Sequence, residues 1–196
     1  MNEIYFPEED SYLLAGILKK QIPKILAKNK NAKFLEIGSG SGFQLQTAFN
    51  SGIKKENIFS CDINPSSVKH CKNLGFNSVV SNLFQTFERK VKRRFVATRM
   101  PIACPRKFDL IVFNAPYLPE DEREPNDSKI ATTGGKKGSE IINKFLKQSK
   151  KHLAKNGRIF IVASSLTKGI NFLEFKKKIV AKKKIFFEEL KVWEIF

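Results

Sequence analysis

The sequence predicts an α/β fold: a mostly parallel sheet of seven strands, with helices on both faces and an antiparallel hairpin at the C-terminal end. Two observations carry this prediction. Short apolar segments alternate with amphipathic segments of helical period, and two β-type segments close the chain at 177–185 and 190–196 with little room for a helix between them. The length of 196 residues suits one ordinary domain, so we expect a single domain over 1–196.

The first half of the chain predicts three strands and three helices. Asp10 and Ser11 can cap a helix with one apolar face, which we expect to end near Pro23. We expect residues 1–30, which contain this helix, to form an N-terminal lid over a cofactor. The next elements are strands at 33–37, 58–61 and 78–80, and helices at 43–49 and 66–74.

The second half begins with an almost continuous apolar run at 108–113, which is typical of a buried parallel strand. An amphipathic helix at 139–153 follows, and Gly157 leads into a strand at 158–163. Two segments lie outside this alternation: 88–107, which we interpret as a basic insertion or loop, and the polar segment 119–137. Long loops in compact domains are usually functional or disordered.

Composition excludes several classes of protein. Three cysteines without a C-x-x-C pair and only two histidines argue against a metal site and against a disulfide framework. The N-terminus is acidic and no uncharged apolar stretch could cross a bilayer, so we expect a cytoplasmic protein without membrane contact. The net charge of +17 favours anionic partners such as RNA or ribosomes, although lysine-rich solvated helix faces account for much of it.

A glycine-rich turn follows the first strand. Glu36, Gly38, Gly40 and Gly42 form the pattern E-x-G-x-G-x-G, with Ser39 inside the turn. The spacing differs from the dinucleotide-binding G-x-G-x-x-G, and no Lys-Ser or Lys-Thr pair is present to form a P-loop. The pattern is typical of class I methyltransferases, which have a Rossmann-like fold and use S-adenosyl-L-methionine, so we expect that cofactor.

Two further strand ends complete the expected cofactor site. Asp62 lies about 20 residues after the glycines, where a carboxylate can accept both ribose hydroxyl hydrogens. Asn82 and Leu83 follow the third strand, at the place where this fold contacts adenine. Asn82 can hydrogen-bond the edge of the base, and Leu83 can pack against its face.

The loop after the most apolar strand carries the expected chemistry. Asn114 and Ala115 offer a side-chain oxygen and a backbone carbonyl as acceptors for the hydrogens of a planar nitrogen. Pro116 restricts the backbone so that both acceptors point inward, and Tyr117 offers a flat face to a planar group. Such a loop suits methyl transfer to an amide or to an exocyclic base amine, and it needs no strong base.

These motifs together resemble the HemK-type protein-glutamine methyltransferases, in the short archaeal and eukaryotic branch that modifies release factors. The resemblance spans nearly the whole chain. Its matching segments are Tyr5 to Ser11 (Y-x-P-x-E-D-[ST]), Glu36 to Gly42, Asp62-Ile63-Asn64-Pro65 (the ribose motif), Asn114 to Tyr117 (N-P-P-Y) and Gly134 to Glu140 (G-G-x-x-G-x-E). The resemblance implies that Glu9, Asp10, Ser11 and Ile63 line the cofactor pocket.

The resemblance also implies a substrate and a partner. The substrate would be the glutamine side-chain amide in the Gly-Gly-Gln loop of a peptide chain release factor. The partner would be a small zinc-binding activator protein that forms a heterodimer with the enzyme and covers an apolar face. The chain departs from the family in having Ala115 in place of a proline, Asn82 where Asp is common, and a longer segment at 88–107.

Two other functions remain open from the sequence. An RNA or DNA methyltransferase acting on an exocyclic base amine would use the same loop, and the basic surface favours it, but the base would have to be flipped into the pocket. A non-catalytic scaffold derived from a methyltransferase would retain the basic surface. The intact Gly38, Gly40, Asp62 and Asn114 argue against a scaffold.

Overall fold

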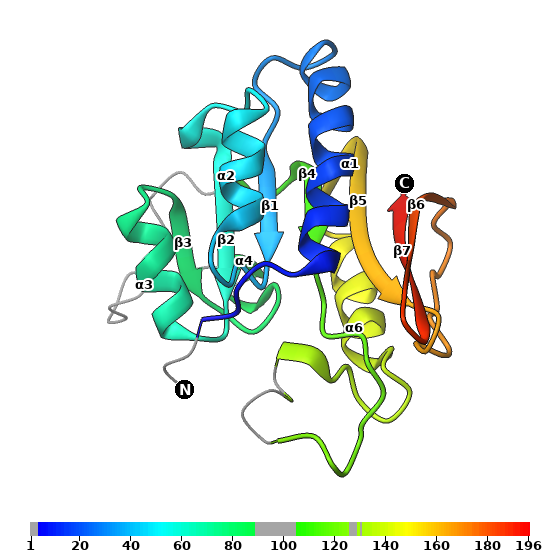
Figure 1. The fold of residues 1–196 in the computed structure, drawn as a ribbon. Helices are drawn as coiled ribbons and strands as arrows, with labels where there is room; N and C mark the ends of the chain where they lie inside the picture. The colour runs from blue at the N-terminus through cyan, green and yellow to red at the C-terminus, as the bar shows by residue number, and fades with distance from the viewer. Residues whose placement is uncertain (1–3, 89–104, 126–128, 130) are drawn as a thin grey trace.

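A computed structural model describes residues 4–88, 105–125, 129 and 131–196. The chain forms a seven-stranded sheet in the order β3-β2-β1-β4-β5-β7-β6 (Figure 1). The strands are β1 Phe34–Ile37, β2 Ile58–Asp62, β3 Asn77–Val80, β4 Phe108–Phe113, β5 Leu153–Ser164, β6 Lys177–Ile185 and β7 Glu188–Ile195. The helices are α1 Glu9–Leu26, α2 Phe43–Asn50, α3 Pro65–Asn73, α4 Gln85–Glu88 and α6 Glu140–Ser149, with a 3₁₀ turn η1 at Lys55–Asn57.

The pairing of the strands confirms the predicted fold class. Strands β1 to β5 are parallel, whereas β7 runs antiparallel to both β5 and β6. The strand order reverses between β1 and β4, because the chain first builds outward through β2 and β3 and then returns to the other side of β1. Loops at such a switch point separate from one another and leave a crevice at the carboxyl ends of the strands.

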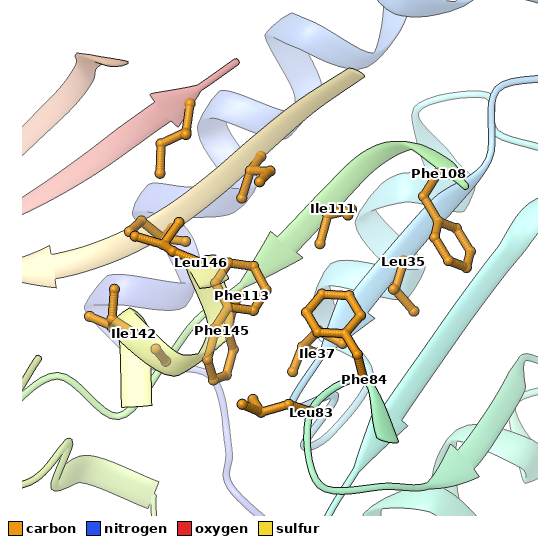
Figure 2. Close-up of a cluster of buried hydrophobic side chains, with 14 of the residues drawn as sticks. Leu35, Ile37, Leu83, Phe84, Phe108, Ile111, Phe113, Ile142, Phe145 and Leu146 are labelled. Atoms are coloured by element: carbon orange, nitrogen blue, oxygen red, sulfur yellow. The ribbon is translucent and has the colours of Figure 1, made fainter. Parts of the chain in front are cut away.

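One face of the sheet packs against α6 and the segment around α4. Figure 2 shows Phe84 and Phe145 from this layer against Ile37, Ile111 and Phe113 of the sheet. Phe145 stacks on Phe84 with ring centroids 5.6 Å apart and meets Phe113 at 4.9 Å. Because Phe113 is the last residue of β4, this aromatic cluster holds the strand end from which the reactive loop begins.

The other face packs against α1, α2 and α3 (Figure 1). Leu14, Leu18 and Ile22 of α1 are fully buried against this face, together with Leu45 of α2. Successive residues of a strand point to opposite faces. Leu110 and Val112 of β4 therefore pack under α1 and α2, while their neighbours Ile111 and Phe113 pack under α6.

Two predicted helix boundaries are wrong. Helix α1 does not end near Pro23 but continues to Leu26. Pro23 lies on the exposed face, where water can hydrate the carbonyl left without a proline N–H, and buried Ile22 continues the apolar stripe. The helix predicted to reach 153 ends at Ser149, because Leu153 instead begins β5 and pairs with Phe108.

The structure describes the two long loops, 88–107 and 119–137, to different extents. The expected basic loop 88–107 lies almost wholly outside the described residues. Segment 119–137 is described except for 126–128 and 130, and it lies beyond the carboxyl ends of the strands (Figure 1). Across the described ranges, no helix is long and apolar enough to cross a membrane.

Candidate active site

A cavity of about 1410 Å³ lies at the carboxyl ends of β1, β2 and β4. Ten of the residues predicted from sequence line it: Asp10, Gly38, Gly40, Asp62, Ile63, Asn82, Leu83, Asn114, Ala115 and Pro116. They come from five separate segments of the chain. The topology therefore brings the expected cofactor residues and the reactive loop to one place.

The glycine turn forms the floor of this cavity. Gly38, Gly40 and Gly42 have φ angles of +68°, +46° and +76°, in the left-handed region that glycine adopts without strain. The backbone N–H groups of Gly38 and Ser39 donate to the carbonyl of Cys61, at 2.8 and 3.2 Å. The turn is thereby tied to the end of β2, and α2 begins immediately after it.

Asp62 connects the glycine turn to the segment after β2. Its Oδ2 accepts from the backbone N–H of Gly40 at 2.8 Å, and its Oδ1 accepts from that of Asn64 at 2.8 Å. Burial raises the pKa of Asp62, and these backbone donors partly oppose the rise. The carboxylate still lines the cavity, so its remaining lone pairs can receive ligand hydroxyl groups.

Glu36 lies behind the cavity rather than on its wall. The side chain is buried, and burial together with nearby Asp62 raises the pKa of its carboxyl well above the usual range. The backbone N–H of Leu45 donates to this carboxyl, whereas Oε2 has no hydrogen-bond partner within the described part of the chain. The Glu36 carboxyl therefore lies near Asp62 as a buried group whose protonated form is favoured.

On the reactive loop, Asn114 has one satisfied and one unsatisfied end. Its Nδ2 donates to Ser11 Oγ at 3.2 Å, whereas its Oδ1 is buried without a partner among the described residues. Ala115 is also buried and lines the cavity. A residue of the cavity wall therefore carries a buried acceptor that the described residues leave without a donor.

Tyr117 does not line the cavity, although we predicted a flat face there. Its hydroxyl donates to Asp10 Oδ2 at 3.3 Å, and its backbone carbonyl accepts from Thr167 Oγ1 at 2.7 Å. Tyr5 also donates to Asp10, at 3.1 Å. In this structure Tyr117 thus links the reactive loop to the N-terminal segment and to the chain after β5.

Glycines in the segment 134–138 support the reactive loop from behind. A β-carbon on Gly134 would lie 2.6 Å from the carbonyl oxygen of Pro116, and one on Gly138 would overlap that of Tyr117. The backbone N–H of Gly134 donates to the carbonyl of Leu118 at 2.9 Å. The G-G-x-x-G spacing therefore permits a backbone-to-backbone contact that larger residues would prevent.

Other predicted site residues lie off the cavity wall. Glu9 points to solvent and pairs with Lys183 of β6. Ser39 and Gly42 are structural parts of the glycine turn, with Gly42 packed against Cys71 and Leu74. Ser11 is buried, and its hydroxyl oxygen accepts a hydrogen bond from Asn114, which lines the cavity.

Sequence reasoning missed several wall residues. Tyr5, Asn64, Ser67 and Lys144 line the cavity, and Glu120 to Glu122 form part of its rim. A usable signal existed for two of them, since Tyr5 opens the N-terminal signature and Asn64 caps α3 through Ser66. Lys144 lies on the polar side of an amphipathic helix, and nothing local to it indicates a cavity.

Comparison with known proteins agrees with this geometry. The model of the Eco57I restriction-modification methylase family matches residues 56–189. A protein of Methanocaldococcus jannaschii named as a protein N5-glutamine methyltransferase is 39% identical over 97% of this chain and 90% of its own length. The eRF1 methyltransferase catalytic subunit of Schizosaccharomyces pombe is 30% identical over 90% of this chain and 79% of its own.

A solved structure has the same fold. The E. cuniculi Mtq2–Trm112 complex, described as responsible for methylation of the eRF1 termination factor, matches with a TM-score of 0.65 and 18% identity, over 100% of this chain and 98% of the matched chain. The names of both relatives specify methyl transfer, and that of the M. jannaschii protein specifies glutamine as the acceptor. The chain belongs to the HemK-type family of protein-glutamine methyltransferases.

Proposed function

We propose that this enzyme transfers a methyl group from S-adenosyl-L-methionine to the side-chain amide nitrogen of a glutamine in a peptide chain release factor. One observation carries the proposal most directly: Asn114, a residue of the cavity wall, has a buried Oδ1 acceptor with no partner among the described residues. Buried acceptors normally have a hydrogen-bond donor, and an N–H group of a bound substrate would supply one here. A primary amide has the two N–H groups that this acceptor and a neighbouring carbonyl can receive.

The cavity fits the proposed cofactor. Asp62 offers lone pairs for ribose hydroxyls beside the glycine turn, whose left-handed glycines allow a ligand to approach the backbone. Asn82 and Leu83 offer an edge and an apolar surface for adenine. When bound, S-adenosyl-L-methionine supplies an activated methyl group on its sulfonium sulfur.

The residues of the chain act mainly by orienting and stabilising the amide. An amide nitrogen is a weak nucleophile because its lone pair is delocalised into the carbonyl. Asn114 Oδ1 and the Ala115 carbonyl can accept its two hydrogens, and both bonds strengthen as the nitrogen gains positive charge. A proton can then leave to water after transfer, so no strong general base is required.

The relatives indicate the kind of substrate. One has a name that specifies protein N5-glutamine methylation, and the other has a name that specifies eRF1. A direct test incubates the enzyme with labelled cofactor and a release factor from the same cell, followed by peptide mass spectrometry. We expect one added methyl group on the glutamine of the Gly-Gly-Gln loop, and far slower addition with the Asn114→Ala enzyme. Methyl groups found only elsewhere would contradict the proposal.

Methylation of an exocyclic base amine is the second candidate function. The match to a restriction-modification methylase model and the net charge of +17 favour it. The same assay with RNA and DNA oligonucleotides of matched sequence separates the two functions. Transfer to a base amine, with an unmodified release factor, would replace the first candidate by the second.

We also propose that the enzyme works with a small zinc-binding activator protein and is located in the cytoplasm. The structural match to an Mtq2–Trm112 complex supports a protein partner, since that enzyme is observed with a second protein. The positive surface further supports association with RNA or ribosomes, which would bring the enzyme near translation factors. Affinity purification of the tagged chain from its own cells, followed by mass spectrometry, tests both associations. We expect the activator to stay bound at high salt and the RNA to be released, because only the RNA contact is expected to be electrostatic.

A further inference from the structure

A continuous chain of hydrogen bonds joins the start of α1 to the reactive loop. Ser11 Oγ donates to Asp10 Oδ1 at 3.1 Å, and Asn114 Nδ2 donates to Ser11 Oγ at 3.2 Å. Asp10 and Ser11 are both buried, with 7% and 4% of their surfaces exposed. The second of these hydrogen bonds joins residues 103 positions apart in the sequence. It ends at the Asn114 amide, which we propose contacts the substrate.

The chemistry of Asp10, Ser11 and Asn114 determines which group donates and which accepts in these two hydrogen bonds. An ionised carboxylate can only accept hydrogen bonds, so the Ser11 hydroxyl must direct its single hydrogen to Asp10. The Ser11 hydroxyl can then offer Asn114 only the lone pairs of its oxygen. The amide of Asn114 must therefore turn its Nδ2 to Ser11, which leaves Oδ1 as the end of the amide that has no partner among the described residues.

The surroundings of Asp10 keep it an acceptor. The hydroxyls of Tyr5 and Tyr117 both donate to its carboxylate, at 3.1 and 3.3 Å. Burial and the nearby Asp10 raise the pKa of both tyrosine hydroxyls, so they remain protonated donors. The backbone N–H of Ser11 adds a further donor to Asp10 at 2.5 Å. All four neighbouring groups thus direct hydrogens toward this carboxylate.

Ser11 is also held in place through its main chain. Gln44 of α2, itself buried, donates from Nε2 to the backbone carbonyl of Ser11 at 2.9 Å. The hydroxyl therefore projects toward Asn114 from a backbone anchored at both of its polar groups. Little freedom remains for Ser11 to follow a rotated amide.

From this geometry we propose that Ser11 is a positioning residue: oriented by Asp10, its hydroxyl selects the one amide rotamer of Asn114 that presents an acceptor to the substrate. The inference rests on the proposed function, because the acceptor matters only if the substrate offers an N–H. It differs from the role implied by family resemblance, in which Ser11 contacts the cofactor directly. A rotated Asn114 would present Nδ2 to the cavity and repel a donor amide.

Three variants test the proposal by activity. Ser11→Ala removes the orienting hydroxyl, and we expect kcat to fall by about tenfold to a hundredfold, the scale of a misplaced reactive group. Ser11→Thr retains a hydroxyl and should restore most of kcat. Asp10→Asn introduces donors next to Ser11, which frees the Ser11 hydrogen to point at Asn114 and should lower kcat further. The affinity for cofactor should change little in the two Ser11 variants.

The control is Ser149→Ala, which removes another buried, hydrogen-bonded serine hydroxyl, on α6. It should lower the free energy of unfolding about as much as Ser11→Ala does, and leave kcat unchanged. If both variants lowered kcat equally, loss of stability would explain the result and the proposal would fall. If Ser11→Ala weakened cofactor binding but kept kcat, Ser11 would be a cofactor ligand and the proposal would also fall.

A second measurement needs no substrate and so separates this inference from the proposed function. The side-chain N–H signals of Asn114 are identified by NMR through their loss in Asn114→Asp. In the wild type and in Ser11→Thr one of these hydrogens should exchange slowly with water; in Ser11→Ala it should exchange faster. Unchanged exchange in Ser11→Ala would overturn the inference. A wild-type enzyme with protected exchange but no activity on a release factor would overturn only the proposed substrate.

Discussion

Gly138 lies directly against the carbonyl oxygen of Tyr117, so closely that a β-carbon at this position would overlap it. Gly138 also has a φ of +78°, where other residues are strained. Residues 134–138 thus lie directly against the backbone of the reactive loop. Side-chain size at Gly138 therefore sets how far Asn114 to Tyr117 can extend into the site.

Replacement of Gly138 by alanine should displace the reactive loop. We expect turnover to fall by about a hundredfold, because a shift of this kind misaligns the substrate nitrogen. Cofactor affinity should remain close to that of the wild type, since the backbone against Gly138 belongs to Tyr117 to Pro119 and not to the glycine turn or Asp62. Steady-state kinetics and calorimetry with S-adenosyl-L-methionine measure the two effects. Gly16→Ala is the control, because a β-carbon there meets nothing within 4 Å inside α1, and it should leave both quantities unchanged.

Substitution of Asn114 should separate chemistry from cofactor binding. Asn114→Ala removes Oδ1, which has no partner among the described residues and which we assign to the substrate amide. Loss of one such preorganised group typically lowers kcat by roughly a hundredfold to a thousandfold. The dissociation constant of the cofactor, measured by calorimetry, should stay near the wild-type value. Full activity in Asn114→Ala would require the reactive group to be sought elsewhere in the cavity.

Asp62 should have the opposite profile. Asp62→Ala removes the acceptor for ribose hydroxyls and also the hydrogen bond from the Gly40 N–H, which helps to shape the glycine turn. We therefore expect a higher dissociation constant for the cofactor and, at saturating cofactor, a smaller loss of kcat than for Asn114→Ala. Asp62→Asn keeps an acceptor oxygen and should bind with intermediate affinity. Equal affinities for all three proteins would show that the ribose is held by other groups.

The pH dependence of cofactor binding should reflect the raised pKa of Asp62. Burial places this pKa above the ordinary aspartate value of 3.8, and the ribose hydroxyls bind the ionised form. Affinity should therefore be complete above the raised pKa and decline as the pH falls through it, at higher pH than for an exposed aspartate. Calorimetry at a series of acidic pH values, at constant ionic strength, measures the decline. Asp62→Asn should reduce the dependence, and any remainder would reflect Glu36, whose carboxyl pKa is also raised.

Much of the fold follows from patterns local in the sequence. All seven strands were predicted because each is a short apolar or alternating run, and the almost wholly apolar β4 is the clearest example. Helix ends were less predictable. Exposed Pro23 is tolerated within α1, and Leu153 leaves the stripe of α6 to pair with Phe108, because tertiary packing outweighs local signals.

The candidate site was predictable as a set of motifs but not as a set of contacts. Glycine spacing and Asp62 identify a cofactor site, since both depend on backbone geometry near one strand end. The bond between Ser11 and Asn114 joins residues 103 positions apart, and no local pattern indicates it. Likewise, nothing in the sequence near Glu9 shows that its carboxylate would pair with Lys183 on β6.

The aromatic cluster beneath the reactive loop should link stability to activity. Phe145 is fully buried between Phe84 and Phe113, so Phe145→Ala should lower the free energy of unfolding by about 3–5 kcal/mol. Because Phe113 immediately precedes Asn114, the cavity left behind should also loosen the loop and reduce kcat under conditions where the protein is still folded. Urea denaturation and steady-state kinetics measure the two effects. The matched control is Phe187→Ala, where a ring that is 98% exposed is removed and stability should change by less than about 0.5 kcal/mol. A fall in stability without any fall in kcat would show that the loop is held by its own hydrogen bonds to Ser11 and Thr167 rather than by the core beneath it.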